Sequence, residues 1–357
     1  MPERAAAGRQ MPIARPGEPL LRVSDLKRYF DVSPPLLNRL LEQGGRRIVH
    51  AVDGVSFAIP RGETFSLVGE SGCGKSTVAR LVVGLYPPTS GSILFENVEL
   101  GDPRARRRNA AIQARMQMIF QDPYASLNPR WRTADIIAEP LRARKLVRGA
   151  AAVRARVGEL LRQVGLAPSD GEKYPHEFSG GQRQRISIAR ALAGEPEFLV
   201  CDEPTSALDV SVQAQILNLM KDLQRRLGLT YLFISHDLAV VYHVSNRVGV
   251  MYLGRIVETN ATQDLFARPS HPYTRMLLDA IPDLEMSGRA RTPVAGEVPS
   301  PINPPSGCAF HPRCPHANDR CRVEVPKLKQ SARGGEVACH AFDEGRLPAW
   351  HATVRQG

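Results

Sequence analysis

The feature that most constrains this chain is the eight-residue segment 69–76, which reads Gly-Glu-Ser-Gly-Cys-Gly-Lys-Ser. It has the form G-x-x-x-x-G-K-[ST] of a phosphate-binding loop, in which Lys75 can reach the β- and γ-phosphates and the Ser76 hydroxyl can bind Mg²⁺. Residues 64–68 predict a short buried strand before the loop. Residues 76–84 predict a helix after it, whose N-terminus attracts anions. A chance match is disfavoured because strand, loop and helix together are the context that this motif requires.

Glycines and an upstream aromatic pair extend this candidate site. The residues of the loop and of the helix start that we expect to hold a nucleotide are Gly69, Ser71, Gly72, Cys73, Gly74, Lys75, Ser76 and Thr77. Glycine allows φ > 0 and lets N–H groups approach a phosphate closely. Ahead of the loop, Tyr29 or Phe30 could stack on an adenine ring. Either could equally be a core aromatic at the end of a strand, and the spacing alone does not decide.

Polar residues also follow two apolar runs further along the chain. Residues 116–120 predict a strand that ends at Gln121, whose amide can contact Mg²⁺ and water or simply belong to a turn. Residues 198–203 predict a buried strand that ends in Asp202 and Glu203. Two carboxylates are costly there unless they meet a cation. We therefore expect Asp202 to hold the Mg²⁺ of an ATPase and Glu203 to polarise a water molecule.

A histidine follows the next buried run. Residues 231–234 predict this strand, and His236 comes two positions after it. A lone histidine is usually inert, but its order after the other motifs favours a contact with the γ-phosphate. The alternation of strands and helices predicts an α/β fold with a largely parallel core sheet and its chemistry at the strands' carboxyl ends. The helix-rich segment 133–164 interrupts the β-pattern and suggests a subdomain.

A second anion-binding element is predicted at residues 179–182, Ser-Gly-Gly-Gln. Ser179 would cap a helix over residues 182–193, and Gly180 and Gly181 would expose N–H groups at its positive end. One nucleotide bound within one chain does not need both anion sites.

Composition and charge exclude several classes of protein. No apolar run approaches the roughly 20 residues that span a bilayer. Residues 1–19 are rich in Ala, Arg, Pro and Gly, so we expect a disordered segment and no secretory signal. The net charge is +11, but the basic residues are spread out and are not interleaved with aromatics as a base-stacking surface requires. We therefore expect no nucleic-acid partner.

Taken in series, these motifs resemble those of the ATP-binding subunits of ABC transporters. The most specific is Phe178-Ser179-Gly180-Gly181-Gln182, the ABC signature, in which Phe178 conservatively replaces the usual Leu. The closer resemblance is to the second ATPase subunit of dipeptide and oligopeptide importers. It is carried by residues 120–129, 174–185, 208–215 and 271–274 and by a cysteine-rich tail.

The resemblance implies the architecture of a phosphate-loop ABC ATPase. This comprises a RecA-like core, an antiparallel β subdomain, a helical subdomain at about residues 122–190 and a small cysteine-rich C-terminal extension. The ATPase domain would span residues 20–268 and the importer-type C-terminal region residues 269–357. ATP and Mg²⁺ are the implied cofactors.

The resemblance also implies roles for individual residues. Two ATPase chains would meet head to tail, so that the loop of one faces the signature of the other across ATP. Lys75 and the loop glycines would hold the phosphates, Phe30 in preference to Tyr29 would stack on adenine, and Mg²⁺ would be bound by Ser76, Gln121 and Asp202. Glu203 would be the base that activates water, and His236 would contact the γ-phosphate. Asp209 would lie at the interface of the two chains, and the nucleotide of the second chain would be contacted by Ser179, Gly180, Gly181 and Gln182.

The implied partners are a related ATPase subunit in a heterodimer, two transmembrane permeases and an extracytoplasmic peptide-binding protein. The helical subdomain near residues 121–141 would transmit motion to the permeases. The chain would then be peripheral, on the cytoplasmic face of the inner membrane. Alternatives are an importer for another solute, such as glutathione or a metal chelate, and a soluble ABC-type ATPase acting on DNA or ribosomes. Soluble factors usually carry two ATPase halves, whereas this chain has one.

The tail holds four of the chain's six cysteines: Cys308, Cys314, Cys321 and Cys339. We expect Pro-rich coil after Ser270, and four cysteines in a short cytosolic segment favour a metal site over disulfides. The spacing lacks the paired C-x2-C of common zinc sites, and four thiolates also suit a [4Fe–4S] cluster. The resemblance favours the cluster over Zn²⁺, and free buried thiols are the remaining alternative. Cys73 and Cys201 are expected to be small buried fillers.

Overall fold

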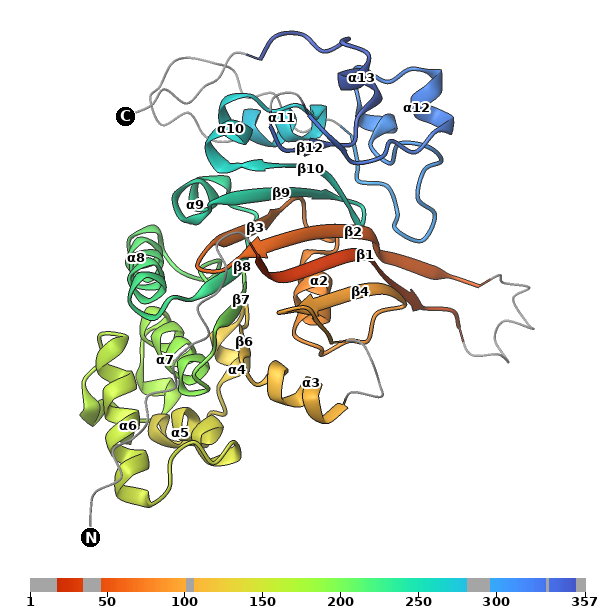
Figure 1. The fold of residues 1–357 in the computed structure, drawn as a ribbon. Coiled ribbons are helices and arrows are strands. Elements are labelled where there is room, and N and C mark those ends of the chain that lie inside the picture. Colours follow the sequence, from red (N-terminus) through yellow and green to blue (C-terminus); the bar gives the residue numbers. More distant parts are fainter. Residues whose placement is uncertain (1–17, 35–45, 101–105, 281–295, 332–333, 351–357) are drawn as a thin grey trace.

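The computed structural model describes residues 18–34, 46–100, 106–280, 296–331 and 334–350, with the backbone alone described over 106–109. We expected residues 1–19 to be disordered. Residues 1–17 lie outside the described ranges, and the first strand begins at Pro19. Within the described residues the strands form two sheets, with helices at one end and the C-terminal region at the other (Figure 1).

The larger sheet has the strand order β11-β12-β10-β9-β3-β8-β7-β6. Its strands are β3 (Thr64–Val68), β6 (Met116–Ile119), β7 (Phe198–Asp202), β8 (Thr230–Ile234), β9 (Arg247–Tyr252), β10 (Arg255–Ala261), β11 (Lys329–Gln330) and β12 (Glu336–Val337). Strands β6, β7, β8, β3 and β9 run parallel, and β10, β12 and β11 continue the sheet antiparallel. Every residue of β3, β7 and β8 is buried, as expected of parallel strands covered on both faces. The predicted parallel core is confirmed.

The smaller sheet is antiparallel and has the order β2-β1-β4-β5. Its strands are β1 (Pro19–Asp31), β2 (Ile48–Pro60), β4 (Ser90–Phe95) and β5 (Val98–Glu99). Helix α2 (Lys75–Val82) packs with both sheets, because its Val78 and Val82 share one buried cluster with Val55 of β2 and Leu232 of β8. This packing fixes the start of α2, and with it the phosphate loop.

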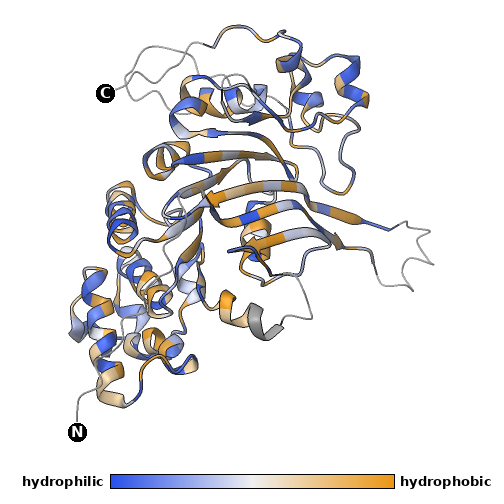
Figure 2. Ribbon diagram, viewed as in Figure 1, coloured by the Kyte–Doolittle hydropathy of each residue, from blue (hydrophilic) through white to orange (hydrophobic). Residues whose placement is uncertain are grey.

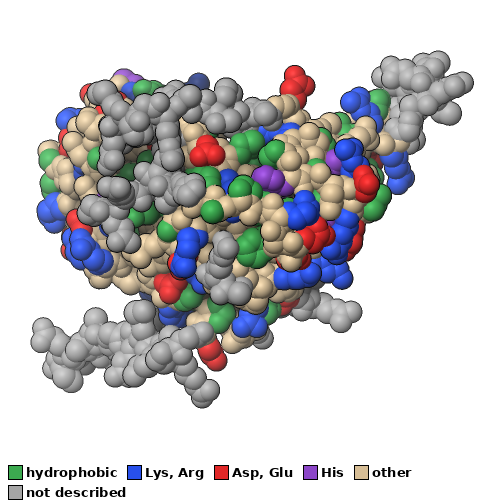
Figure 3. All heavy atoms as spheres, turned by 90° about the horizontal axis from the view of Figure 1, so that it is seen from above, with side chains coloured by type: hydrophobic (Ala, Val, Ile, Leu, Met, Phe, Trp, Pro, Cys, Tyr) green, Lys and Arg blue, Asp and Glu red, His purple; other side chains and the backbone are tan. Residues whose placement is uncertain are grey.

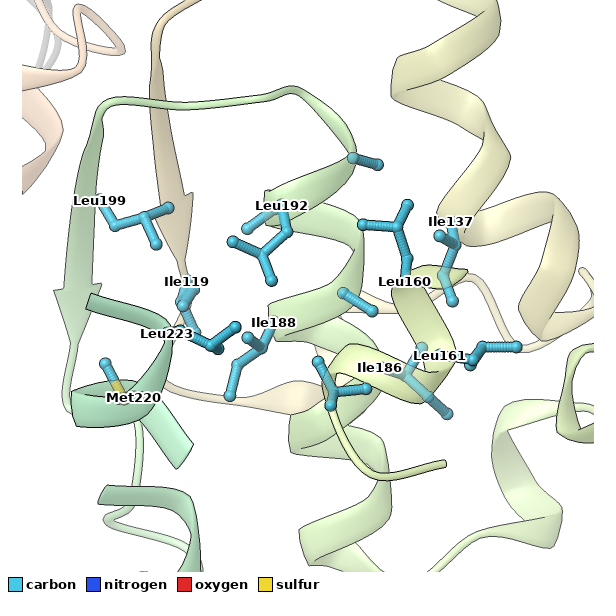
Figure 4. Close-up of a cluster of buried hydrophobic side chains, with 14 of the residues drawn as sticks. Ile119, Ile137, Leu160, Leu161, Ile186, Ile188, Leu192, Leu199, Met220 and Leu223 are labelled. Atoms are coloured by element: carbon cyan, nitrogen blue, oxygen red, sulfur yellow. The ribbon is translucent and has the colours of Figure 1, made fainter. Parts of the chain in front are cut away.

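A helical subdomain lies at one end of the larger sheet. Between β5 and β9 the α-helices are α3 (Arg106–Gln113), α4 (Pro123–Ser126), α5 (Thr133–Ala143), α6 (Ala150–Gln163), α7 (Gly180–Ala193), α8 (Val210–Leu227) and α9 (Leu238–Val244). Figure 4 shows how Ile137 of α5, Leu161 of α6 and Ile186 of α7 meet in a common apolar core. The single helical region expected over residues 133–164 is divided in two, and Gly149, with φ 88°, precedes the second helix.

The C-terminal part differs from its prediction. The expectation of coil after Ser270 is wrong for the residues that follow it directly, because Pro272–Asp279 form helix α11 after a short α10 (Thr262–Ala267). His271 caps α11 by accepting a hydrogen bond from the Tyr273 N–H at 3.0 Å, and Pro272 suits a first helical turn, where no N–H is needed.

Beyond residue 295 the chain is mostly irregular, with short helices α12 (Asp319–Val323) and α13 (His340–Asp343). Strand β12 pairs with β10, so the cysteine-rich segment is attached to the edge of the larger sheet. Figure 1 shows it at the opposite end of the molecule from α5, α6 and α7.

Hydropathy and charge follow this arrangement. Apolar residues concentrate in the strands, and polar residues recur along the outer helices (Figure 2). Among the described side chains on the face shown in Figure 3, basic residues are interspersed with acidic and apolar ones. In the described part of the chain, no helix combines the length and apolar character that crossing a bilayer requires.

Candidate nucleotide-binding site

A cleft of about 680 Å³ opens at the carboxyl ends of the parallel strands. Most of its lining residues were predicted from sequence: Phe30, Ser71, Gly72, Gly74, Lys75, Ser76, Thr77, Gln121, Glu203 and His236. They come from β1, the phosphate loop and α2, and the ends of β6, β7 and β8. The parallel register of β6, β7 and β8 brings these distant segments to one edge of the sheet.

The phosphate loop is tightly enclosed by its neighbours. Gly69 and Gly74 have φ of 151° and 108°. A Cβ on Gly69 would lie 2.2 Å from the Met251 carbonyl oxygen, and one on Gly74 would lie 2.2 Å from that of Ala51. Only glycine can adopt this backbone conformation and fit the available space. The loop therefore requires glycine at both positions.

Lys75 lies inside the loop. Its side chain is buried, and its Nζ donates to the carbonyl oxygens of Gly69 at 2.7 Å and Glu70 at 3.0 Å. The ammonium group is therefore held at the loop by main-chain carbonyl oxygens.

Two of the three expected magnesium ligands, Ser76 and Asp202, meet beside the loop, whereas Gln121 bonds to Glu203. The Ser76 hydroxyl donates to Asp202 Oδ1 at 2.8 Å. Burial raises the pKa of the Asp202 carboxyl, although the Ser76 hydrogen bond and the charge of Arg80 act in the opposite direction. A hydroxyl and a carboxylate suit Mg²⁺, which binds through one or two carboxylates together with substrate phosphates. Such an ion would relieve the cost of the buried carboxylate.

Glu203 joins three strand ends. Gln121 Nε2, after β6, donates to Glu203 Oε2 at 2.9 Å, and His236 Nδ1, after β8, lies 3.2 Å from the same oxygen. Glu203 has φ 46°, a strained conformation for a residue other than glycine, and its N–H donates to the Ile234 carbonyl at 3.0 Å. The carboxylate is thus held at the cleft beside an amide and an imidazole, where it can accept a proton from water.

The two upstream aromatics face different surroundings. Phe30 lines the cleft, and the Arg28 guanidinium lies 4.6 Å from its ring centroid. Tyr29 is absent from the lining residues. Its hydroxyl donates to Asp53 Oδ1 at 2.6 Å, and its ring packs 4.5 Å from that of His50. Burial and Asp53 raise the pKa of Tyr29 to about 12. The structure therefore places Phe30, and not Tyr29, where a base could stack.

The second anion-binding element is well formed but lies outside this cleft. Ser179 caps α7, and the Gln182 side chain accepts the Ser179 N–H at 3.0 Å in return. A Cβ on Gly181 would lie 2.4 Å from Val212 Cγ1, so a larger residue there would displace Val212. Asp209 caps α8 by accepting from the Val212 N–H at 3.0 Å. None of residues 179–182 lines the cleft of their own chain.

The C-terminal region also reaches the site, which sequence reasoning missed. Pro301 lines the cleft, and its carbonyl accepts the His50 N–H at 3.0 Å. Arg313 forms an ion pair at 2.7 Å with Glu70, a residue of the phosphate loop. One signal was present in the sequence: an acidic residue in an anion-binding loop needs a nearby cation.

The six cysteines fall into two groups, two in the ATPase core and four in the tail. Cys73 and Cys201 are buried inside the ATPase core, as predicted. Burial and the neighbouring thiols raise the pKa of Cys308, Cys314 and Cys339 to about 11 each, and Cys321 contributes to all three shifts. Each of these three thiols is thus influenced by two others of the tail. Nevertheless, no three Cys, His, Asp or Glu side chains among the described residues converge to hold a metal ion. The expected four-cysteine metal site is not confirmed.

Comparison with known proteins decides the family. Residues 52–206 match the ABC transporter family, and residues 257–321 match the C-terminal region of oligopeptide/dipeptide transporters. The oligopeptide transport ATP-binding protein AppF of Bacillus subtilis is 49% identical over 91% of this chain and 98% of its own length. The di/tripeptide transport ATP-binding protein DppF of Pseudomonas aeruginosa is 48% identical over 92% and 99%.

The chain belongs to the ATP-binding subunits of ABC transporters. Solved structures agree with this assignment. A subunit of the cbiONQ transporter of Clostridium perfringens is 28% identical, with a TM-score of 0.58 over 70% of this chain and 91% of that one. An ATP-binding cassette solved as a dimer with ADP and phosphate is 26% identical, with a TM-score of 0.59 over 68% and 98%. The protein is an ABC ATPase.

Replacing the aromatic residues of this ABC ATPase should separate their roles. We expect Phe30→Ala to weaken ATP binding about 5- to 150-fold, because a base–aromatic stack contributes about 1–3 kcal/mol. Tyr29→Ala should leave the affinity unchanged. Titration of a fluorescent ATP analogue, with thermal melting as a check on folding, measures both. The opposite ranking of the two variants would exclude Phe30 as the base-stacking residue.

Proposed function

We propose that this ABC ATPase powers the import of dipeptides or oligopeptides across the cytoplasmic membrane. The match of residues 257–321 to the C-terminal region of oligopeptide/dipeptide transporters carries this proposal. Relatives whose names describe peptide transport support it along almost their full length. Import of another solute, such as glutathione or a metal chelate, is the alternative within the family.

The proposed chemistry assigns one task to each group at the cleft. Lys75 and the N–H groups of the loop hold the phosphates, and Ser76, Asp202 and Gln121 would hold Mg²⁺, which supplies positive charge at the phosphates. Glu203 accepts a proton from the attacking water, while His236 lies beside it to contact the γ-phosphate. Because charge on the transferred phosphoryl group needs cations and N–H dipoles placed in advance, these groups would act through their fixed positions.

We further propose that two ATPase chains close head to tail around ATP, the second being a related subunit. The position of residues 179–182 supports this, because their helix N-terminus is built for an anion but does not line the cleft of its own chain. The solved relative with ADP and phosphate is itself described as dimeric. Asp209, which caps the helix that packs against Gly181, would lie at the seam.

A groove next to the cleft suits a permease segment. It measures about 800 Å³ and lies between the core and the helical subdomain, with Phe120, Gln121, Glu139 and Arg190 among its lining residues. Because Gln121 lines both the groove and the nucleotide cleft, a permease segment seated here would sense the state of the site. The chain would then be peripheral, on the cytoplasmic face of the membrane.

Replacing the proposed base should uncouple binding from turnover. We expect Glu203→Gln to lower kcat for ATP hydrolysis by about 10²–10⁴-fold, to leave ATP affinity unchanged and to accumulate an ATP-dependent dimer with the related subunit. Phosphate release and size-exclusion chromatography measure these effects. Glu195→Gln, at a distant and exposed carboxylate, serves as the control. Normal hydrolysis by Glu203→Gln would show that another group is the base.

The importer function is tested on the assembled complex. Affinity purification of the tagged chain from detergent-solubilised membranes should recover two multi-span permeases and the second ATPase. In proteoliposomes, a peptide-loaded binding protein should stimulate ATP hydrolysis. Stimulation by glutathione or a metal chelate instead of peptide would select the alternative solute. Recovery of the chain with ribosomes or DNA, and without membrane proteins, would reject the importer.

We also propose that the four tail cysteines hold a [4Fe–4S] cluster. Four cysteines within residues 308–339 support this, because Cys thiolates are the ligands of such clusters. Cys308 and Cys321 also belong to adjacent backbone, since the Cys308 N–H donates to the Cys321 carbonyl at 2.8 Å.

The cluster has a direct spectroscopic test. Anaerobically purified full-length protein should be brown, with broad absorption near about 400 nm and about four irons per chain. Cys314→Ala should lose the colour, whereas Cys201→Ala, at a buried cysteine of the core, should keep it. A colourless protein with one zinc, or with no metal, would overturn the cluster.

A further inference from the structure

The phosphate loop contains an acidic residue where negative charge is unfavourable. Glu70 is the second residue of the loop, and 22% of its side chain is exposed. A carboxylate beside a triphosphate repels it and competes for the same cation. Lys75 Nζ donates to the main-chain carbonyl oxygen of Glu70 at 3.0 Å, so Glu70 directly borders the ammonium group that ATP requires. A second cation that pairs with the Glu70 carboxylate would remove this conflict.

That cation is Arg313 of the C-terminal region. Its Nη1 donates to Glu70 Oε2 at 2.7 Å, and its Nη2 donates to Oε1 at 3.0 Å. Two such parallel bonds fix the geometry of both partners. Only 2% of the Arg313 side chain is exposed, and its guanidinium lies 5.7 Å from the ring centroid of Tyr252 and 5.9 Å from that of Phe310. These rings hold the guanidinium against the loop.

The backbone of the same loop residue is held by Tyr273. The Glu70 N–H donates to the Tyr273 hydroxyl at 2.9 Å, and the Tyr273 ring packs against Tyr252 with centroids 4.7 Å apart. The start of α11, which carries Tyr273, is anchored to the main sheet. The buried Glu258 carboxylate of β10 accepts the N–H groups of Ser270 and His271, both at 2.8 Å. The C-terminal region thus forms hydrogen bonds with both the side chain and the main chain of Glu70.

We propose that Arg313 and Tyr273 are positioning residues for ATP binding. Arg313 keeps the Glu70 carboxylate away from Lys75, so that the ammonium group is available to the phosphates, and Tyr273 fixes the loop backbone. The C-terminal region is therefore part of the nucleotide site of its own chain. This inference rests on the proposed assignment of the loop as the ATP site.

The test measures the affinity of the full-length chain for a fluorescent ATP analogue at low and high salt. We expect Arg313→Gln to weaken binding about 10- to 100-fold, with a smaller loss at high salt because the released carboxylate is screened. Glu70→Gln should bind at least as tightly as the wild type. The double variant Glu70→Gln/Arg313→Gln should recover most of the affinity, because no carboxylate then competes for Lys75.

A purely structural role for Arg313 makes the opposite prediction, namely that the double variant binds as weakly as Arg313→Gln. That result would overturn the proposal. If Arg313→Gln does not fold, Glu70→Gln and Tyr273→Phe decide instead. Tyr273→Phe keeps the packed ring and removes the acceptor of the Glu70 N–H, so we expect binding about three- to tenfold weaker. Unchanged affinity in Tyr273→Phe together with reduced affinity in Glu70→Gln would also overturn the proposal.

Two further variants make the result specific. Arg320 pairs with Glu324 and Glu344 in the same cysteine-rich segment, so Arg320→Gln controls for general disturbance of that segment and should bind normally. Lys75→Ala tests the site itself. If Lys75→Ala binds ATP like the wild type, the proposed site is wrong. If Lys75→Ala loses binding while Arg313→Gln and Tyr273→Phe retain it, only the present inference is wrong.

Discussion

The ammonium group of Lys75 is a buried cation, and a buried cation must be surrounded by oxygen atoms. The phosphate loop supplies them through the carbonyl groups of Gly69 and Glu70. It can curl in this way because Gly69 and Gly74 adopt positive φ and lie against the backbones of Met251 and Ala51. Those neighbours belong to β9 and β2. The loop therefore depends on strands from both sheets, and its geometry is a property of the assembled core.

The parallel sheet then determines which chemistry is possible. Strands β6, β7 and β8 end at the same edge, so the polar residues that follow them meet around the Glu203 carboxylate. Burial on both faces of β7 and β8 leaves their carboxyl ends as the places where polar groups can collect. Asp202, which accepts a hydrogen bond from the Ser76 hydroxyl, is the last residue of β7 at the same edge. A site for nucleotide and metal is the outcome that satisfies these buried charges.

The C-terminal region contacts both the main sheet and the phosphate loop. Its β12 extends the main sheet beside β10, and its Arg313 reaches the second residue of the phosphate loop. Arg313 directly precedes Cys314 and ends the short turn that begins at His311. The segment proposed to hold a cluster and the loop proposed to hold ATP are thus joined by one buried ion pair. In the proposed importer, the family-specific region would be coupled directly to the energy-converting site.

Some features were determined by the sequence alone. The loop at residues 69–76, the strand ends at Gln121, Asp202, Glu203 and His236, and the helix cap at Ser179 were all predictable, because short motifs and the alternation of apolar runs are local properties of the chain. The mixed α/β class followed from the same alternation. These patterns could not determine features that depend on strand register or on contacts between residues far apart in the sequence.

The tertiary structure decided those choices. The register of β1 against β2 shifts between Arg28 and Tyr29, so counting along the strand could not tell which aromatic faces the cleft. Helix α11 replaced the expected coil because its first turn is held by Glu258 of a neighbouring strand. Arg313 and Glu70 are 243 residues apart, and no local pattern specifies such a pair. The sequence thus determined the chemistry available at each strand end, and only packing decided which side chains share one site.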